Sequence, residues 1–176
     1  MKPLIALAAV AILLPSLASA QNRQVDTTPI QNFILPDYLG TWYEIARLDH
    51  SFERGMNNVT AEYFLRDDGK IDVLNSGWKN GEFKVANGKA KQPYPASNPA
   101  HLMVSFFLFF YNDYKVLMLD PYHQISLVGS SSPKYLWILS RSPKVSKLSL
   151  APILKEAQER GYDTSKLIWV DQSMHY

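Results

Sequence analysis

The side chains with catalytic or metal-binding chemistry are few and widely spaced in this sequence. The four histidines, His50, His101, His123 and His175, lack metal-ligand spacing, and the chain contains no cysteine, which removes thiol nucleophiles, thiolate metal sites and disulfides. Neither a Gly-x-Ser-x-Gly motif nor a phosphate-binding loop is present. The sequence therefore predicts no metal, no cofactor and no enzyme, and leaves an exported esterase-like enzyme as the alternative of another class.

Three aspartates, Asp67, Asp68 and Asp72, lie close enough in sequence to raise the question of a calcium site. The residues between them are those of a tight hairpin turn, because an Asp-Gly pair accepts positive φ angles. Apolar and polar residues alternate on both sides of this turn, as they do in a half-buried strand. We therefore interpret the aspartates as part of a hairpin.

The first twenty residues have the pattern of a cleaved signal peptide. Lys2 precedes an apolar run from Leu4 to Leu14, and Ala18-Ser19-Ala20 gives the small residues that signal peptidase requires. The run is shorter than the roughly 20 residues of a membrane-spanning helix. We expect residues 1–20 to be removed, with a retained N-terminal anchor as the alternative, and residues 21–35 to form a flexible lead-in.

Residues 36–176 are expected to form one domain, because their number suits a single hydrophobic core. The whole chain has 18 basic and 16 acidic residues and a formal net charge of +2. Since no basic patch or charged block stands out, we expect no nucleic-acid partner.

From Trp42 to Ser140 the sequence predicts short strands separated by turn signals. Turns are expected at Asn80-Gly81 and Asn87-Gly88, and the prolines between Pro93 and Pro99 indicate a stiff loop. The count is eight strands joined mostly by sequential hairpins. Such strands tend to close, because closure removes exposed edges.

One segment has helical periodicity. Leu150, Ile153, Leu154 and Ala157 share a face, with Ser149 as the expected N-cap and Gly161 after the last turn. The predicted fold is therefore all-β, an eight-stranded antiparallel up-and-down β-barrel with a C-terminal α-helix packed on the outside. A last short strand is expected at 167–170.

Three motifs occur in order along the chain: Gly40-Thr41-Trp42, Asp120-Pro121-Tyr122, and Arg141 at the end of an expected strand. Together they resemble the lipocalin family, over roughly residues 36–170. The stretches 42–52, 102–107 and 135–143 resemble bacterial lipocalins related to apolipoprotein D. The resemblance implies a structural role for Gly40, Trp42, Asp120, Tyr122 and Arg141, with the arginine packed across the tryptophan at the closed end of the barrel.

The same resemblance implies that the protein binds and carries or stores a hydrophobic ligand, a fatty acid or a lysophospholipid, in the bacterial envelope. A tetrapyrrole or another apolar small molecule is the alternative ligand. Many bacterial relatives carry a lipid-modified cysteine, whereas position 21 here is Gln21. We therefore expect a soluble periplasmic protein. An outer-membrane barrel is disfavoured, because Glu62, Arg66, Lys70 and Asp72 occupy the expected outward face.

Strand alternation orients the interior. If Trp42 and Arg141 point inward, so do Glu44 and Ala46 on the first strand, because side chains alternate. On the other strands we take the more apolar face as the inward one, which places Ile125 inside the barrel. The expected ligand-binding residues are Glu44, Tyr63, Asn75, Leu102, Val104, Phe106, Tyr114, Val116, Met118, Leu127, Tyr135, Trp137 and Leu139. A barrel filled by its own side chains would use the same residue types.

Two features at this interior have consequences of their own. A carboxylate buried at Glu44 is costly unless paired or protonated, so we expect a raised pKa and hydrogen bonds to tyrosines, to Asn75 or to a ligand head group, with a structural network that makes no ligand contact as the alternative. The segment Phe106–Tyr111 places six large apolar residues at the open end, where they contact a membrane surface, guide lipid or form a homodimer contact. In the alternative, half of them extend the strands inward.

Overall fold

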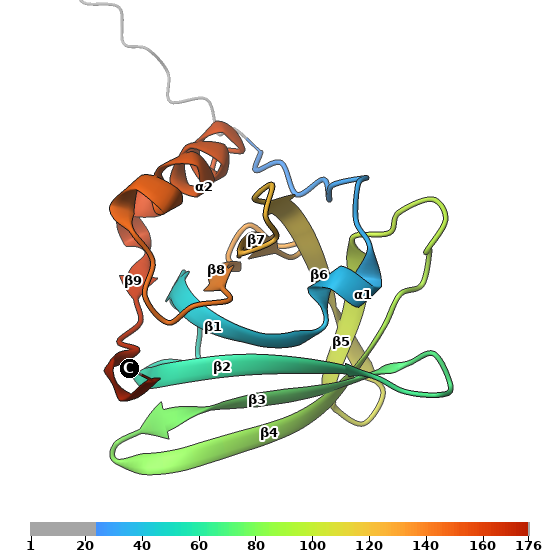
Figure 1. Cartoon of the computed structure of the whole chain (residues 1–176), viewed down its shortest axis with the longest axis horizontal. Coiled ribbons are helices and arrows are strands. Elements are labelled where there is room, and N and C mark those ends of the chain that lie inside the picture. Colours follow the sequence, from blue (N-terminus) through green and yellow to red (C-terminus); the bar gives the residue numbers. More distant parts are fainter. Residues whose placement is uncertain (1–23, 176) are drawn as a thin grey trace, which may run out of the picture.

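The computed structural model describes residues 24–175, and these residues form a closed barrel with one long helix outside it (Figure 1). The elements in chain order are α1 (Leu35–Tyr38), β1 (Gly40–Arg47), β2 (Met56–Leu65), β3 (Ile71–Lys79), β4 (Glu82–Lys91), β5 (His101–Phe107), β6 (Phe110–Leu119), β7 (Ile125–Gly129), β8 (Leu136–Ser140), α2 (Lys147–Glu159) and β9 (Ile168–Trp169). One-turn 3-10 segments follow α2 at Thr164–Lys166 and end the described chain at Ser173–His175.

Closure is made by β1, which pairs antiparallel with β2 on one side and with β8 on the other. All other barrel strands pair with their neighbours in sequence. The short strand β9 pairs with β1 at Ala46 and Arg47, beyond the part of β1 that β2 covers. The predicted eight-stranded antiparallel barrel is thus confirmed, with β9 as an additional strand on its wall.

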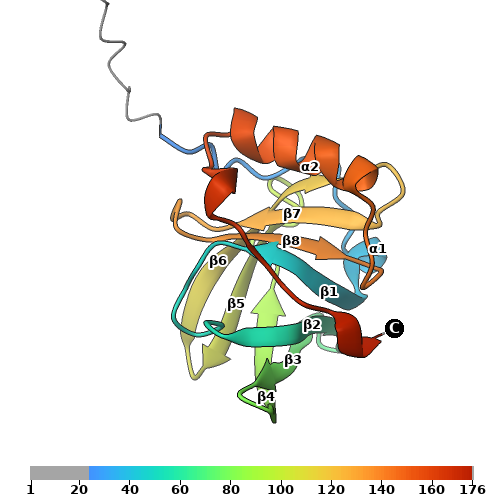
Figure 2. The same ribbon diagram turned by 90° about the vertical axis from the view of Figure 1, so that its left-hand side faces the viewer.

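The helix α2 lies across the outside of the barrel, over β7 and β8 (Figure 2). It buries Leu150, Ile153 and Ala157, which pack with outward-facing residues of the wall such as Ile138. Its N-cap is Ser146, whose side chain accepts a hydrogen bond from the backbone N–H of Ser149, so the expected cap at Ser149 was one turn too late.

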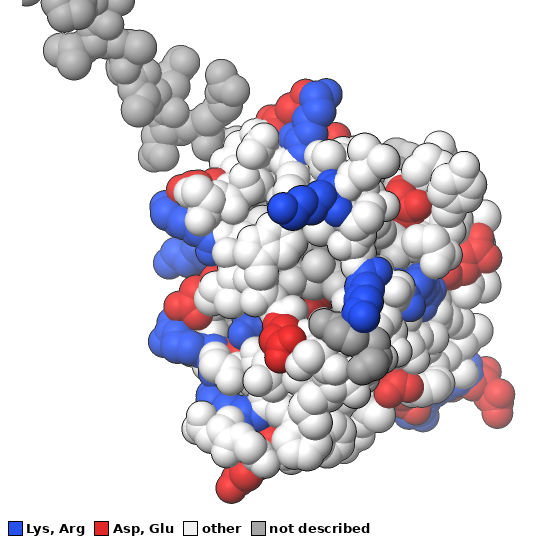
Figure 3. Space-filling view, turned by 60° about the vertical axis from the view of Figure 1, so that its left-hand side comes forward, with Lys and Arg blue, Asp and Glu red and all other residues white. Residues whose placement is uncertain are grey.

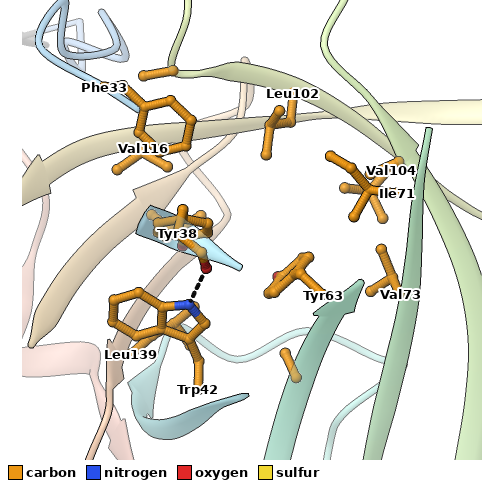
Figure 4. Close-up of a cluster of buried hydrophobic side chains, with 14 residues drawn as sticks. Phe33, Tyr38, Trp42, Tyr63, Ile71, Val73, Leu102, Val104, Val116 and Leu139 are labelled. Carbon is orange, nitrogen blue, oxygen red and sulfur yellow. Dashed lines mark hydrogen bonds between the residues drawn. The ribbon is translucent and has the colours of Figure 1, made fainter. Parts of the chain in front are cut away.

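The closed end of the barrel is filled by aromatic and aliphatic side chains (Figure 4). Trp42 is fully buried, and its indole N–H donates to the carbonyl of Tyr38 at 2.8 Å. The guanidinium of Arg141 lies 3.8 Å from the centre of the Trp42 ring and donates to the carbonyls of Thr41, Leu39 and Asp37. The arginine therefore combines a cation–π contact with hydrogen bonds that fix the start of β1.

The loop that joins β6 to β7 lies at the same end. The carboxylate of Asp120 accepts backbone N–H bonds from Tyr122, Gln124 and Ile125 and so holds this turn together. Tyr122 itself is exposed. Gly40 has a φ of +89°, a conformation that favours glycine at the entry to β1.

Two sequence expectations need correction. Residues 24–34 do not form a loose lead-in: Phe33 is buried in the core, and the Ile30 N–H donates to the carbonyl of Val116. Asn80-Gly81 is the expected turn, with positive φ at both residues, but Asn87 and Gly88 continue strand β4. A Cβ at Gly88 would lie only 2.7 Å from the Phe106 ring, so the glycine serves close packing between β4 and β5.

Charged side chains are distributed over the surface with both signs interspersed, as Figure 3 shows for one face. Within residues 24–175, no helix is long and apolar enough to cross a membrane.

Candidate ligand-binding site

The half of the barrel next to the open end contains a cavity of about 550 Å³. Its walls come from β2 to β6 and from the loop that joins β1 to β2. Most lining side chains are apolar, with a few amides, hydroxyls and charges among them: Phe52, Glu53, Met56, Val59, Asn75, Ser76, Lys79, Lys84, Val85, Ala86, Phe106, Phe107, Phe110 and Asn112. A largely apolar pocket of about 300–1,000 Å³ with a few polar groups is typical of a small-molecule site.

A second, much smaller cavity of about 50 Å³ lies deeper in the barrel. Glu53, Val59 and Asn75 border both spaces, so the small cavity continues the large one downward. Beneath it, Tyr63, Tyr114 and Tyr38 are joined by hydrogen bonds between their hydroxyl groups. The barrel is therefore open in one half and filled in the other.

The structure brings most of the predicted lining residues to the interior. Those that border one of the two cavities are Glu44, Tyr63, Asn75, Phe106, Tyr114, Trp137 and Leu139, and Tyr135 borders a third space, described below, beside the free edge of β6. Leu102, Val104 and Val116 belong to the packed core inside the barrel. Their role in ligand binding stays a prediction.

Met118 and Leu127 were placed on the wrong face by the sequence analysis, and so was Ile125. All three pack with the outer cluster beneath α2. Every residue of β7 is buried, because the barrel interior covers one face and α2 covers the other. Alternation cannot distinguish the faces of such a strand, and a bulge between Val116 and Met118 shifts the parity of β6 as well.

The expected inward position of Ala46 is also wrong, because β1 has a bulge between Glu44 and Ala46. Ala46 pairs with the outward-facing Ile138 and packs in the outer cluster, whereas Arg47 pairs with Trp137 and points inward. The extra residue reverses which side chains face the interior. As a result Arg47, which the sequence analysis missed, is one of the largest fully buried side chains.

Arg47 is the centre of a buried polar network beside the small cavity. Its guanidinium donates to Glu44 Oε1 at 2.5 Å and to the backbone carbonyl of Glu53 at 2.7 Å. The Glu53 carboxylate accepts the indole N–H of Trp137 at 3.0 Å, and His50 Nε2 lies 2.9 Å from the same oxygen. The network ties the loop between β1 and β2 to the barrel interior, because Glu53 belongs to that loop.

The two carboxyl groups of the network titrate differently. Burial raises the pKa of Glu44 well above its ordinary value, and the charge of Glu53 adds to this effect while Arg47 opposes it. Burial works against the charge of Glu53 too, but His50, Trp137 and Arg47 lower its pKa overall. The expected raised pKa at Glu44 is thus found, but its neighbours are Arg47 and Glu53, where the sequence analysis expected tyrosines or Asn75.

Asn75 has an unusual position at the boundary of the two cavities. Its side-chain oxygen is buried and has no hydrogen-bond partner. A buried acceptor without a donor is unfavourable, and a bound molecule with a hydroxyl or amine group could satisfy it. Lys79 and Lys84 border the large cavity and were also missed, because single lysines near turns give no signal in sequence.

The segment Phe106–Tyr111 forms the tip of the hairpin that joins β5 to β6 at the open end. Phe109 is 84% exposed, and Phe107, Leu108 and Phe110 are exposed as well. The ammonium groups of Lys89 and Lys91 lie over the rings of Phe109 and Tyr111. Phe106, Phe107 and Phe110 also border the large cavity, so the tip is both a surface feature and part of the entrance.

The histidines lie in separate places, and within the part of the chain that the structure describes no three His, Asp or Glu residues converge on a possible metal site. His101 pairs with Asp113 at 2.7 Å, and His123 lies 3.8 Å from Asp37. The apolar walls of the large cavity, with Asn75, Lys79 and Lys84 among them, suit an apolar molecule with a small polar group.

Comparisons with known proteins agree with this geometry. The outer membrane lipoprotein Blc of Vibrio cholerae is 48% identical over 82% of this chain and 85% of its own length. Apolipoprotein D of Mus musculus is 33% identical over 89% of this chain and 88% of its own length. Insecticyanin from the tobacco hornworm Manduca sexta has a similar structure, with a TM-score of 0.69 at 25% identity, over 83% of this chain and 84% of that protein. A family model for the lipocalin-like domain matches residues 34–172, and the chain therefore belongs to the lipocalin family.

Proposed function

We propose that this protein binds one acyl lipid, a fatty acid or a lysophospholipid, in the open half of its barrel and carries or stores it in the cell envelope. The observation that carries the proposal is the 550 Å³ cavity with its mostly apolar lining. The ligand's acyl chain lies among Val59, Ala86 and Phe106, and its polar end stays at the open end of the barrel.

Simple energetics support binding without covalent chemistry. Burial of about 15 methylene groups at ~0.8 kcal/mol each gives roughly 12 kcal/mol before costs. Ordering the ligand and losing its free motion costs about 4–15 kcal/mol, which leaves affinities in the micromolar range within reach. The protein in this role is a binding protein and not an enzyme.

The exposed tip of the β5–β6 hairpin gives this carrier a means of reaching its ligand. Phe107, Leu108 and Phe109 present apolar surface at the cavity entrance, and Lys89 and Lys91 stand beside them. Apolar side chains flanked by lysines favour contact with a membrane that carries anionic lipids. In this proposal the tip rests on the membrane while lipid enters the barrel.

The envelope location rests on the resemblance to proteins named as outer membrane lipoproteins. The proposed form is a soluble periplasmic protein. Fractionation after gentle osmotic shock separates this form, which is released into buffer, from one that stays with the membranes.

The central test is whether the protein holds lipid in this cavity. Organic extracts of the purified protein, examined by mass spectrometry, are expected to contain acyl lipids. Ala86 borders the cavity, and an Ala86→Trp substitution that displaces two methylenes at ~0.8 kcal/mol each lowers the affinity for a sixteen- to eighteen-carbon lipid about tenfold.

Ala151→Trp is the matched control, because Ala151 lies on the exposed surface of α2 and is far from the cavity in the fold. It is expected to leave lipid affinity unchanged. Equal affinities for the two variants would show that lipid does not occupy the cavity. Hydrolysis of a chromogenic acyl ester by the purified protein would instead favour an enzyme.

A further inference from the structure

The wall of the barrel has a gap at the open end between β6 and β8. Strand β6 begins at Phe110, but its pairing with β7 begins only at Lys115, opposite Gly129 at the end of β7. The residues 110–114 of β6 therefore lack a β7 partner in the described structure. The loop of residues 130–135, which joins β7 to β8, lies beside this free edge.

A separate cavity of about 560 Å³ occupies this gap. Its lining includes residues from both faces of β6: Asn112 pairs with the core residue Val104 and faces inward, whereas Asp113 pairs with Met103 on the outer face. Opposite residues of an antiparallel pair share a face. The cavity therefore passes through the wall, and we name it the side opening. Phe52 and Asn112 also border the large cavity of about 550 Å³, which we call the main cavity from here on, so the two spaces adjoin.

The side opening has a different chemical character from the main cavity. Its inner part presents aromatic rings, since Tyr135 and Trp137 stack at 5.9 Å with an interplanar angle of 11° and Phe52 lies 6.4 Å from Tyr135. Its outer part presents the hydroxyls of the 130–132 loop and one carboxylate, Asp113. None of its lining residues is a lysine or an arginine, whereas two lysines border the main cavity.

Asp113 is held in place and remains charged. Its carboxylate lies 2.7 Å from His101 Nε2 and accepts a hydrogen bond from the hydroxyl of Ser131. Partial burial opposes the charge, but the hydrogen bonds from Ser131 and His101 lower the pKa of Asp113 overall. A carboxylate next to aromatic rings favours an organic cation, because the ring faces attract positive charge and the alkyl groups on the cation pack against them.

A cation lies close by on the outer surface. Lys91 pairs with Met103, which in turn pairs with Asp113, so Lys91 and Asp113 lie in one row across three strands, roughly 10 Å apart at the backbone. The Lys91 ammonium lies 4.5 Å from the centre of the Tyr111 ring. Lys91 therefore places a positive charge beside the side opening, on the same outer face as Asp113.

We propose that the side opening binds a zwitterionic lipid head group, with its ammonium end against Asp113, Tyr135 and Trp137 and its phosphate toward Lys91. This inference rests on the proposed function, since the acyl chain of the same molecule occupies the main cavity. It makes a lysophospholipid with a choline or ethanolamine head group a better ligand than a fatty acid of equal chain length.

The test compares three probes that share one oleoyl chain: oleoyl lysophosphatidylcholine, oleoyl lysophosphatidic acid and oleate. Titration calorimetry on the wild-type protein is expected to show the tightest binding for the choline lipid. Asp113→Asn and, separately, Tyr135→Leu are expected to weaken binding of the choline lipid about tenfold and to change oleate binding less than about twofold.

A control variant separates recognition from structure. Tyr122→Leu removes an exposed tyrosine at the closed end, away from the side opening. It is expected to bind the choline lipid as the wild type does. Thermal unfolding midpoints confirm that each variant is folded.

The outcomes distinguish the two proposals. If the wild-type protein binds none of the three probes, the proposed function fails and the head-group site fails with it. If it binds oleate and the choline lipid with equal affinity, or if Asp113→Asn and Tyr135→Leu weaken both to the same degree, the carrier function stands and the side opening is not a head-group site.

Discussion

The closed and open halves of this barrel are built from the same strands but differ in how their interiors are used. At the closed end, Trp42, Tyr38 and Tyr63 fill the space between the strands and Arg141 covers it. At the open end, the strands enclose a cavity of about 550 Å³ and end in exposed aromatic residues. One half therefore supplies stability and the other keeps surface free for a ligand.

The boundary between the halves is polar. Glu44, Arg47, Glu53 and Asn75 lie at the level where the packed core gives way to the cavity. Buried charges are costly unless they are paired, so this layer depends on its own internal contacts. Substitutions in the three regions should therefore have three different consequences.

The largest effect is expected from Trp42→Ala in the closed half. Removal of a fully buried indole leaves a cavity and takes away the contact with Arg141, at a cost of about 3–5 kcal/mol in the free energy of unfolding. Urea denaturation measures this cost. Phe107→Ala, at a 67% exposed position of the open end, is the control and should change stability by less than about 0.5 kcal/mol. Similar losses for both variants would contradict the division between the halves.

The next effect is expected at the boundary, from Arg47→Met. The substitution leaves Glu44 and the carbonyl of Glu53 without their hydrogen-bond donor, and each buried polar group left unsatisfied in this way costs about 1–3 kcal/mol. The double variant Glu44→Gln, Arg47→Met should recover part of the loss, because no unpaired acid remains. Lys155→Met breaks an exposed ion pair on α2 and should cost less than about 1 kcal/mol. An equal loss for Lys155→Met would refute a special role for the boundary.

The boundary should also make stability depend on pH. Because the pKa of Glu44 is raised on folding, the folded protein holds a proton that the unfolded chain releases above its ordinary value of 4.5. Stability from this group therefore falls as pH rises above that value, by at most about 1.4 kcal/mol per pH unit. The pKa of Glu53 is lowered on folding, so its contribution to the free energy of unfolding is present above pH 4.5 and is lost as the pH falls below that value.

Glu44→Gln removes the first of these two contributions. In urea denaturation between roughly pH 5 and pH 8, the stability of Glu44→Gln relative to the wild type should increase with pH. Parallel curves for the two proteins over this range would show that Glu44 is ionised in the folded state, contrary to its raised pKa.

The sequence predicted the positions of side chains well in some regions and poorly in others, and the local structure of each region explains the difference. Trp42 and Arg141 at the closed end were placed correctly because a short motif determines their contact. Leu127 was misplaced because β7 is buried on both faces, so alternation carries no information there. Arg47 was missed because one bulge reverses the facing of β1, although the need of a buried Glu44 for a cation three residues away was a usable signal.

The open half was the least predictable region, because a lined cavity and a filled one use the same residue types. Sequence alternation brought Asn75, Trp137 and Leu139 to the interior, yet only the structure separates residues that border the cavity from residues that pack beneath it. The short β7 strand, and with it the side opening, depends on pairing between distant segments that no local pattern records.

The smallest effect on stability, and one confined to the open half, is expected from Phe109→Ser. The residue is 84% exposed, so its loss should change the free energy of unfolding by less than about 0.5 kcal/mol. Full insertion of this side chain into lipid contributes about 1.5–3 kcal/mol, so the variant should bind vesicles containing anionic lipid at least about tenfold more weakly in a flotation assay. Leu148→Ser removes an equally exposed apolar side chain, 85% exposed, from α2 on the barrel's outer wall. It should float with vesicles as the wild type does, and an equal loss for both variants would mean that the membrane attracts exposed apolar residues in general and that the hairpin tip has no particular role.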